Sequence, residues 1–434
     1  MNRFLFAKRL DSWLAPSDAF ILLFAALPHA FWLDREHHQQ HRFSVIGASA
    51  GGIVESDLDS LKRLLNELKW PNDISVPFDF RPGLVGAFSY EGESDLLFIC
   101  ESAIVFDHDA KQVWFVGVHE NEDDFEHWIN AALLRFALVG GQQLRYRAAR
   151  GQLDTGKPEL RHSSERYLQL IERSQQHISV GDVYQICLTN EISVQSSADP
   201  LMTFLRLREA NPAPYAAYLR AGDRSVVSAS PEQFLQVNAK GMISTKPIKG
   251  TRRRSQDRNE DASIAAELQS NLKERAENLM IVDLMRNDLG RVCAVGSIDV
   301  PKLFEIETYA TVHQLVSTVV GKMRPDLSVL DVLAAAFPGG SMTGAPKIRA
   351  MEILGELEAG KRGIYSGVLG YIGANNVADL GMVIRTLVFD GERVTIGVGG
   401  GITIDSVPVD ELEETRLKAG ALLAAIGAAD PWAR

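Results

Sequence analysis

Short apolar runs alternate with turn-forming residues over the first third of the chain. The runs at 43–47, 84–90 and 113–117 have the length and the β-branched and aromatic content of strands. Between them, apolar positions recur with helical spacing at 58–68 and 123–138. This pattern predicts an antiparallel or mixed sheet with helices packed against it.

A polar, turn-rich segment at 148–164 predicts a linker between residues 1–150 and a second region, residues 165–425. In the second region, helices are expected at 164–178, 261–284, 327–336, 347–357 and 408–426. Strands are expected at 184–188, 216–219, 225–228, 234–237, 367–371, 381–389 and 393–398. The alternation predicts an α/β or α+β fold with large, mainly antiparallel sheets.

The composition narrows the class of protein. A chain of 434 residues with 46% hydrophobic side chains can bury a large core. Its 45 basic and 56 acidic side chains give a net charge of −11, which disfavours nucleic acids and anionic membranes as partners. The apolar stretch at 19–27 is too short to span a bilayer and is interpreted as a buried strand or helix. Three cysteines without metal-ligand spacing indicate a reducing compartment, so a cytoplasmic location is expected.

Lys249 is a candidate nucleophile within the run PIKGT at 247–251. A lysine amine is almost fully protonated at neutral pH unless burial or a neighbouring cation lowers its pKa. Lys246 and the arginines at 252–254 are neighbouring cations in the sequence. The alternative is a solvated lysine beside an arginine run.

Two predicted helices each carry glutamates three residues apart, which places both carboxylates on one helical face. The pairs are Glu274 with Glu277, and Glu411 with Glu414. Clusters of oxygen ligands suit a hard cation such as Mg²⁺. Two solvated helix faces with an ion pair from Glu414 to Lys418 are the alternative.

Other motifs give weaker signals. The glycine-rich segment at 397–402 can bring bare backbone amides close to an anion, but a simple tight turn is the more common role of such a cluster. The loop at 338–347 lacks the Gly-Lys-Ser/Thr of a nucleotide-binding loop, and the segment at 47–52 lacks the dinucleotide fingerprint. A solvated loop is the expected setting of three histidines, His37, His38 and His41.

Read together, six segments resemble the chorismate-utilising enzyme family. They are SPEQF at 230–234, PIKGTRRR at 247–254, LKERAENLMIVDLMRNDLGRV at 272–292, FPGGSMTGAPK at 337–347, IRTL at 384–387, and GGGITIDS with DELEETRLK within 399–418. The resemblance covers residues 165–425, and residues 1–150 resemble the N-terminal part of anthranilate synthase component I. The resemblance to the chorismate-utilising enzymes implies one large domain of two interleaved α/β halves, with a magnesium-dependent site between sheet and helices.

The resemblance also implies roles for single residues. Glu277 and Glu414 match the family's magnesium ligands, with Glu274 and Glu411 in supporting positions, and Glu232 matches the general acid that protonates the departing hydroxyl of chorismate. The positions that match substrate-binding groups of the family are Thr251, Ser341, Arg385, Gly399 and Lys418. Arg and Lys side chains there would hold the carboxylates of an anionic substrate in this acidic protein.

Two positions indicate the branch of the family. Members that add water to chorismate resemble one another in having a lysine base where this chain has Gln185. This chain therefore lacks the base that the addition of water requires. Anthranilate-forming members typically read PIAGT where this chain reads PIKGT, and the lysine marks the branch that makes 4-amino-4-deoxychorismate for the folate pathway. In that branch Lys249 would act as a covalent nucleophile.

The resemblance also implies partners. The chain lacks the Gly-x-Cys-x-Gly of a glutamine amidotransferase, so ammonia is expected from a separate subunit or from solution. The alternatives are anthranilate synthase component I and a non-catalytic homologue that only binds the amidotransferase. Many relatives have a histidine directly before Leu-Val-Ser, where this chain reads His313-Gln314, and the sequence leaves open which side chain faces the site.

Overall fold

The computed structural model describes residues 3–36, 42–54, 57–139, 146, 154–309 and 312–433. His37, His38 and His41 lie outside the described residues, as does the first part of the predicted linker at 148–164. The apolar stretch at 19–27 falls largely in helix α1 (Pro16–Leu23), which buries Ala19 and Phe20. Within the ranges given, no helix combines the length and the hydropathy needed to cross a membrane.

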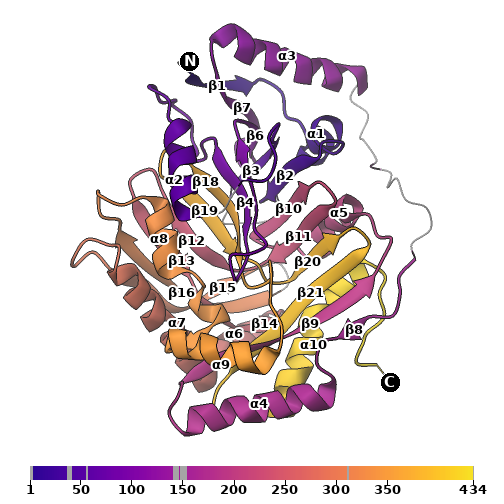
Figure 1. The fold of residues 1–434 in the computed structure, drawn as a ribbon, viewed down its shortest axis with the longest axis vertical. Helices are drawn as coiled ribbons and strands as arrows, with labels where there is room; N and C mark the ends of the chain where they lie inside the picture. Colours follow the sequence, from indigo (N-terminus) through magenta and orange to yellow (C-terminus); the bar gives the residue numbers. More distant parts are fainter. Residues whose placement is uncertain are drawn as a thin grey trace.

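Two antiparallel sheets form the centre of the fold (Figure 1). The first has the strand order β1 (Phe4–Leu10), β7 (Gln112–His119), β6 (Ser102–Asp107), β3 (Phe43–Ala48), β2 (His29–Asp34), β10 (Tyr215–Ala221), β11 (Arg224–Ser230), β20 (Thr386–Asp390), β21 (Arg393–Ile402), β9 (Gln185–Gln195) and β17 (Gly344–Ala345), with β8 (Glu159–Leu160) also paired to β9. The second has the order β14 (Ile248–Arg253), β16 (Val312–Lys322), β13 (Met242–Lys246), β12 (Gln233–Val237), β19 (Ala378–Met382), β18 (Val368–Gly373), β4 (Gly83–Phe88) and β5 (Leu96–Cys100), with β15 (Asp299–Thr308) paired to β16. The predicted fold class, with large antiparallel sheets, is confirmed.

Strands from both ends of the sequence share each sheet. In the first sheet β2 pairs with β10, and Trp32 lies opposite Tyr218. In the second sheet β4 pairs with β18, and Gly86 lies opposite Gly370. Residues 1–150 and 165–425 therefore build the same two sheets.

The molecule has four layers, in which helices cover the outer face of each sheet (Figure 1). Side chains alternate along β2, so that Phe31 and Leu33 enter the core between the sheets while Trp32 enters the core under the helices. The first sheet is covered by α1, α3 (Glu122–Val139), α5 (Pro200–Ala210) and α10 (Pro408–Ala425). The second is covered by α2 (Leu58–Glu67), α7 (Leu272–Gly290) and α8 (Val329–Ala336), while α4 (Ser164–Ser179) and α9 (Lys347–Glu358) pack on β9.

Two predicted elements differ from the structure. The helix expected at 261–284 is two helices, α6 (Arg258–Ser270) and α7, because Asn271 is extended and its side chain accepts the Glu274 backbone N–H to start α7. The strand expected at 381–389 is interrupted between β19 and β20, where Arg385 has a φ of 49°. The break at Asn271 lies just before Glu274, and the break between β19 and β20 contains Arg385, so both interruptions lie at residues of the predicted site.

Candidate active site

Three side chains from different elements converge above Gly401. A methyl group added at Gly401 would lie 2.8 Å from both Gln185 Nε2 and Lys249 Nζ, and 3.5 Å from Glu277 Oε2. Gln185 begins β9, Lys249 lies in β14 and Glu277 in α7. The glycines at 397–402 therefore do not form the predicted turn. They continue β21 and keep its surface bare where the three side chains meet.

Lys249 is enclosed, with 13% of its side chain exposed, and its Nζ lies 3.5 Å from Glu277 Oε2. Burial lowers the pKa of this amine, but the charges of Glu277, Glu232 and other neighbours outweigh burial, and the net pKa is raised. The expectation that neighbouring cations lower this pKa is wrong. Arg252 pairs instead with Glu267 and Glu274, and Arg254 with Asp261.

Glu232 is a buried carboxyl group between β11 and β12, with 7% of its surface exposed. Burial raises its pKa to about 7, and a hydrogen bond from Ser341 together with the charges of Lys249 and Lys418 limits the rise. A large fraction of Glu232 is therefore protonated at neutral pH. This is the state that a general acid requires.

The glutamates of α7 and α10 face each other across one lysine. Lys273 Nζ lies 3.1 Å from Glu411 Oε1 and 4.0 Å from Glu277 Oε1, so one cation fits between the two helices. Glu414 is 56% exposed and lies 2.7 Å from Lys418, whereas Glu274 pairs with Arg252. The described residues contain no cluster of three His, Cys, Asp or Glu that could already hold a metal. The magnesium assignment stays a prediction. The carboxylate oxygens of the site, and the Lys273 ammonium that lies between them, fit this prediction.

Two further cations lie near Glu414. Lys418 Nζ donates a hydrogen bond to Gly399 O at 2.8 Å. The side chain of Arg385 has no hydrogen bond or ion pair with any residue in the described part of the chain, and burial lowers its pKa, opposed by the charge of Glu414. A non-glycine residue at positive φ is strained, and such strain is common at functional sites. An arginine at a strained backbone position, with no partner for its side chain among the described residues, is suited to an anionic ligand.

The register of β16 separates His313 from Gln314. His313 is bonded to Thr308 and Asp261, both at 2.9 Å, and is fully engaged there. Gln314 is opposite Thr251 and donates to its hydroxyl at 3.4 Å, while its buried Oε1 has no hydrogen-bond partner among the described residues. The Oε1 of Gln185 is also buried and lacks a hydrogen-bond partner within the part of the chain that the structure describes. Gln314 is therefore the residue of the two that faces Thr251.

Sequence reasoning missed Lys273. The available signal was its position one helical turn before Glu277, the i, i+4 spacing at which a lysine and a glutamate meet on a helix.

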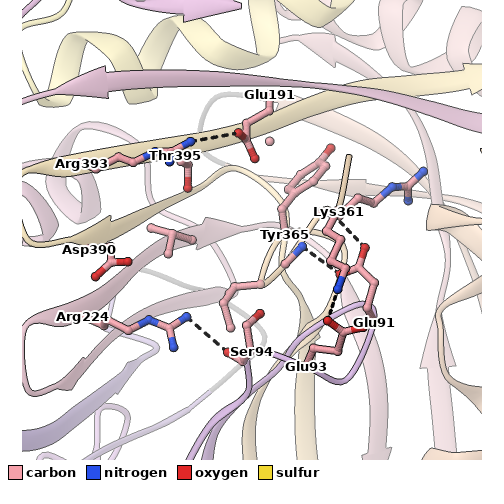
Figure 2. A pocket seen from close by; sticks show the side chains of 15 residues that line it. Glu91, Glu93, Ser94, Glu191, Arg224, Lys361, Tyr365, Asp390, Arg393 and Thr395 are labelled. Atoms are coloured by element: carbon pink, nitrogen blue, oxygen red, sulfur yellow. Dashed lines mark hydrogen bonds and ion pairs between the residues drawn. The ribbon is translucent and has the colours of Figure 1, made fainter. Parts of the chain in front are cut away.

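A cavity of about 340 Å³ lies elsewhere, between the first sheet, at β9, β11, β20 and β21, and the segments 91–94 and 361–365 (Figure 2). Tyr365 and Gly397 line it, and its rim carries the ion pairs of Lys361 with Glu93 and of Arg393 with Glu191. None of the predicted site residues lines this cavity. The candidate chemistry therefore belongs to the site above Gly401.

Comparisons with known proteins identify the family of the chain. Residues 28–424 match the model of the chorismate binding enzyme family. The chain is 40% identical to an aminodeoxychorismate synthase of Streptomyces pristinaespiralis over 94% of this chain and 63% of that protein, so it spans under two thirds of that relative. It is 39% identical to anthranilate synthase component 1 of Geobacillus stearothermophilus, over 76% of this chain and 68% of that protein.

A solved structure has the same fold. Anthranilate synthase component I from Streptococcus pneumoniae TIGR4 superposes with a TM-score of 0.74 at 28% identity, covering 95% of this chain and 97% of that chain. The family match spans both sheets and includes every residue of the site described above. The chain therefore belongs to the chorismate binding enzyme family.

Proposed function

We propose that this chain aminates chorismate at ring carbon 4 to give 4-amino-4-deoxychorismate, as component I of an aminodeoxychorismate synthase. The observation that carries the proposal is the enclosed Lys249 amine beside Gln185, with the charge of Glu232 acting on it. Lysine nucleophiles need such an enclosed position, and the acid has a pKa of about 7. The Streptomyces relative supports this branch of the family.

In the first step the unprotonated Lys249 amine forms a bond to ring carbon 2. The two conjugated ring double bonds shift, and the bond from carbon 4 to its hydroxyl oxygen breaks. Glu232 gives its proton to that oxygen, so the hydroxyl leaves as water and Glu232 becomes a carboxylate. Covalent catalysis of this kind replaces one difficult substitution by two easier ones.

In the second step ammonia bonds to carbon 4, the double bonds shift back, and the bond between carbon 2 and the lysine nitrogen breaks. Lys249 leaves as a neutral amine. The new amino group loses one proton to the Glu232 carboxylate, which restores the acid. Protons and electrons balance over the cycle without an oxidant or reductant.

Positively charged groups would hold the two substrate carboxylates. We assign this role to Arg385 and Lys418, with Thr251 and the backbone at Gly399. Magnesium held by Glu277 and Glu414, with Glu274 and Glu411 in support, would neutralise the ring carboxylate and draw the charge of Glu277 away from Lys249.

A second candidate is the formation of anthranilate. The observation in its favour is the 39% identity to the Geobacillus enzyme and the match to the Streptococcus structure. Incubation with chorismate, Mg²⁺ and ammonium, followed by mass spectrometry, separates the two. Accumulation of aminodeoxychorismate supports the proposal, whereas release of anthranilate with pyruvate supports the alternative.

We also propose that the ammonia comes from a glutamine amidotransferase, and that the product leads to 4-aminobenzoate and folate in the cytoplasm. All three cysteines of the chain are buried: Cys100, Cys187 and Cys293. Burial raises the pKa of each thiol, which is the opposite of what a nucleophilic cysteine requires. These observations favour a glutaminase site on another polypeptide segment.

A further inference from the structure

The first turn of α7 carries a lysine that reaches across to α10. Lys273 is the second residue of α7, and its Nζ lies 3.1 Å from Glu411 Oε1 in the first turn of α10. The same Nζ lies 4.0 Å from Glu277 Oε1, one helical turn further along α7. A cation in the first turn of a helix is opposed by the positive end of the helix dipole. The two carboxylates therefore hold the ammonium in this place, and the helix that carries it does not.

The two carboxylates are enclosed, whereas the lysine is not. The side chains of Glu411 and Glu277 are 5% and 9% exposed. Glu411 Oε1 also accepts a hydrogen bond from Ser406 Oγ at 2.7 Å, so its position does not depend on the lysine. The side chain of Lys273 is 44% exposed, and its flexible four-carbon stem lets the ammonium move into solvent. The lysine is thus the one partner of this cluster that can leave.

A positive charge is needed between the two helices. Without Lys273, Glu411 would have no ion pair among the described residues, and Glu277 would keep only Lys249, at 3.5 Å. An enclosed carboxylate without a cation is unfavourable, because burial removes it from water without compensation. Any cation that reaches both glutamates can meet this need.

The second oxygens of these glutamates lie along the bare surface of β21. A methyl group added at Gly400 would lie 3.3 Å from Glu411 Oε2, and one added at Gly401 would lie 3.5 Å from Glu277 Oε2. Each carboxylate therefore has its Oε1 near Lys273 and its Oε2 beside the strand. Mg²⁺ is typically bound through one or two carboxylates and keeps several waters. The ammonium lies where oxygen ligands from both helices are available to such an ion.

We propose that Lys273 is a placeholder for the divalent cation. Its ammonium neutralises Glu411 and Glu277 in the metal-free protein and moves towards solvent when Mg²⁺ binds. The inference rests on the proposed function for the magnesium assignment alone. Because Mg²⁺ has to break the ion pair with Glu411, the lysine weakens metal binding while it stabilises the junction of α7 and α10 before the metal arrives.

Removal of the ammonium should change metal affinity and metal-free stability in opposite directions. In Lys273→Met, Mg²⁺ alone should bind at least about fivefold more tightly than in wild type by isothermal titration calorimetry, because an ion pair worth about 1 kcal/mol no longer has to be broken. The melting temperature in excess chelator should fall by at least about 1 °C, and this difference from wild type should vanish at saturating Mg²⁺. A lysine that stayed on Glu411 with the metal bound would give the same difference in both conditions.

Two variants serve as controls. Lys62 Nζ lies 2.6 Å from Asp331 Oδ1 in an ion pair that joins α2 to α8, with side chains 31% and 26% exposed. Lys62→Met removes the same charge elsewhere, so it should leave the Mg²⁺ affinity unchanged and affect the melting temperature equally with and without Mg²⁺. Lys273→Arg keeps the positive charge and should bind Mg²⁺ no more tightly than wild type.

The movement of the ammonium can be followed in the wild-type protein, without any substitution. Brief acetylation, followed by digestion and mass spectrometry, measures how fast each lysine reacts. Mg²⁺ should raise the rate at Lys273 severalfold, because the freed ammonium is more accessible, and should leave the rate at Lys62 unchanged.

Three results would overturn the proposal. They are equal Mg²⁺ affinity in wild type and Lys273→Met, a Lys273 that is acetylated at the same rate with and without Mg²⁺, and no Mg²⁺ binding to either protein. The expected shift in affinity, in a protein that releases anthranilate from chorismate, would refute the proposed function alone.

Discussion

The proposed first step requires Glu232 to be protonated while Lys249 is unprotonated, although the pKa of Glu232 is about 7 and that of Lys249 is raised above its usual value. Only a minor fraction of the protein has this combination at any pH. Below about pH 7 the acid stays protonated, and neutral lysine increases about tenfold per pH unit. Above this pH, the loss of protonated acid cancels the gain in neutral lysine. The rate of Lys249 adduct formation should therefore rise up to about pH 7 and then level off.

The assay mixes the protein with chorismate and Mg²⁺ in the absence of ammonia, where the second displacement has no nucleophile and the adduct persists. Quenched samples are measured by intact-protein mass spectrometry from pH 5.5 to 9, and digestion maps the added mass to the peptide containing Lys249. Lys249→Ala should gain no mass. Glu232→Gln should react at least about 100-fold more slowly, and its rate should keep rising above pH 7 because only the lysine still titrates.

Two outcomes would refute this reasoning. A rate that falls about tenfold per pH unit above pH 7 would mean that the acid titrates but the lysine does not act as a nucleophile. Unmodified protein, under conditions where ammonia-dependent turnover is fast, would mean that ammonia adds directly and that Lys249 has an electrostatic role.

Further predictions concern the metal, the nitrogen source and stability. Glu277→Ala should lower chorismate turnover by at least about 100-fold with an unchanged circular dichroism spectrum, because several kcal/mol of charge stabilisation are lost; full activity in excess chelator would contradict the magnesium assignment. The purified chain should consume chorismate with ammonium but not with glutamine, and turnover with glutamine alone would disprove the need for a separate amidotransferase. Burial raises the pKa of Glu232 from 4.5 to about 7, so its contribution to stability is lost as the pH rises between these values. The free energy of unfolding of Glu232→Gln minus that of wild type, measured with urea, should therefore increase by up to about 3 kcal/mol from pH 4 to pH 8. An equal difference at both pH values would contradict the buried acid.

The element types were largely predictable because hydrophobic periodicity depends only on local sequence. The start of α7 was not, because Asn271 ends one helix and begins the next through a single side-chain bond to the Glu274 backbone. The strand conformation of the glycines before Ile402 was not predictable, since sequence alone does not reveal which side chains need the bare strand surface. Pairing of β2 and β4 with later strands was also hidden, because long-range register leaves no local pattern.

In the candidate site, too, some features were predictable from the sequence and others were not. Residue identities such as Lys249 and Glu232 could be predicted from motifs, but their electrostatics could not. The arginines next to Lys249 in sequence lie beside other carboxylates, while Glu277, 28 positions later, sets the direction of the lysine pKa. Likewise, only the register of β16 showed that His313 is engaged with Asp261 and that Gln314 is opposite Thr251.

The charges of the site are nearly balanced, and this balance links the proposed ligands to each other. Five cations stand against four carboxylates when Glu232 is protonated: Lys249, Lys273, Lys418, Arg252 and Arg385 against Glu274, Glu277, Glu411 and Glu414. A dianionic substrate alone would leave an excess of negative charge, and a divalent cation alone an excess of positive charge. Both together preserve the balance, so each should bind more tightly in the presence of the other, by the same factor in both directions. Within this balance Glu232 is set apart, because burial raises its pKa and the charges that act on it belong to lysines, whereas every other carboxylate of the site lies in an ion pair. The separation lets one acid hold a proton beside carboxylates that are each paired with a cation.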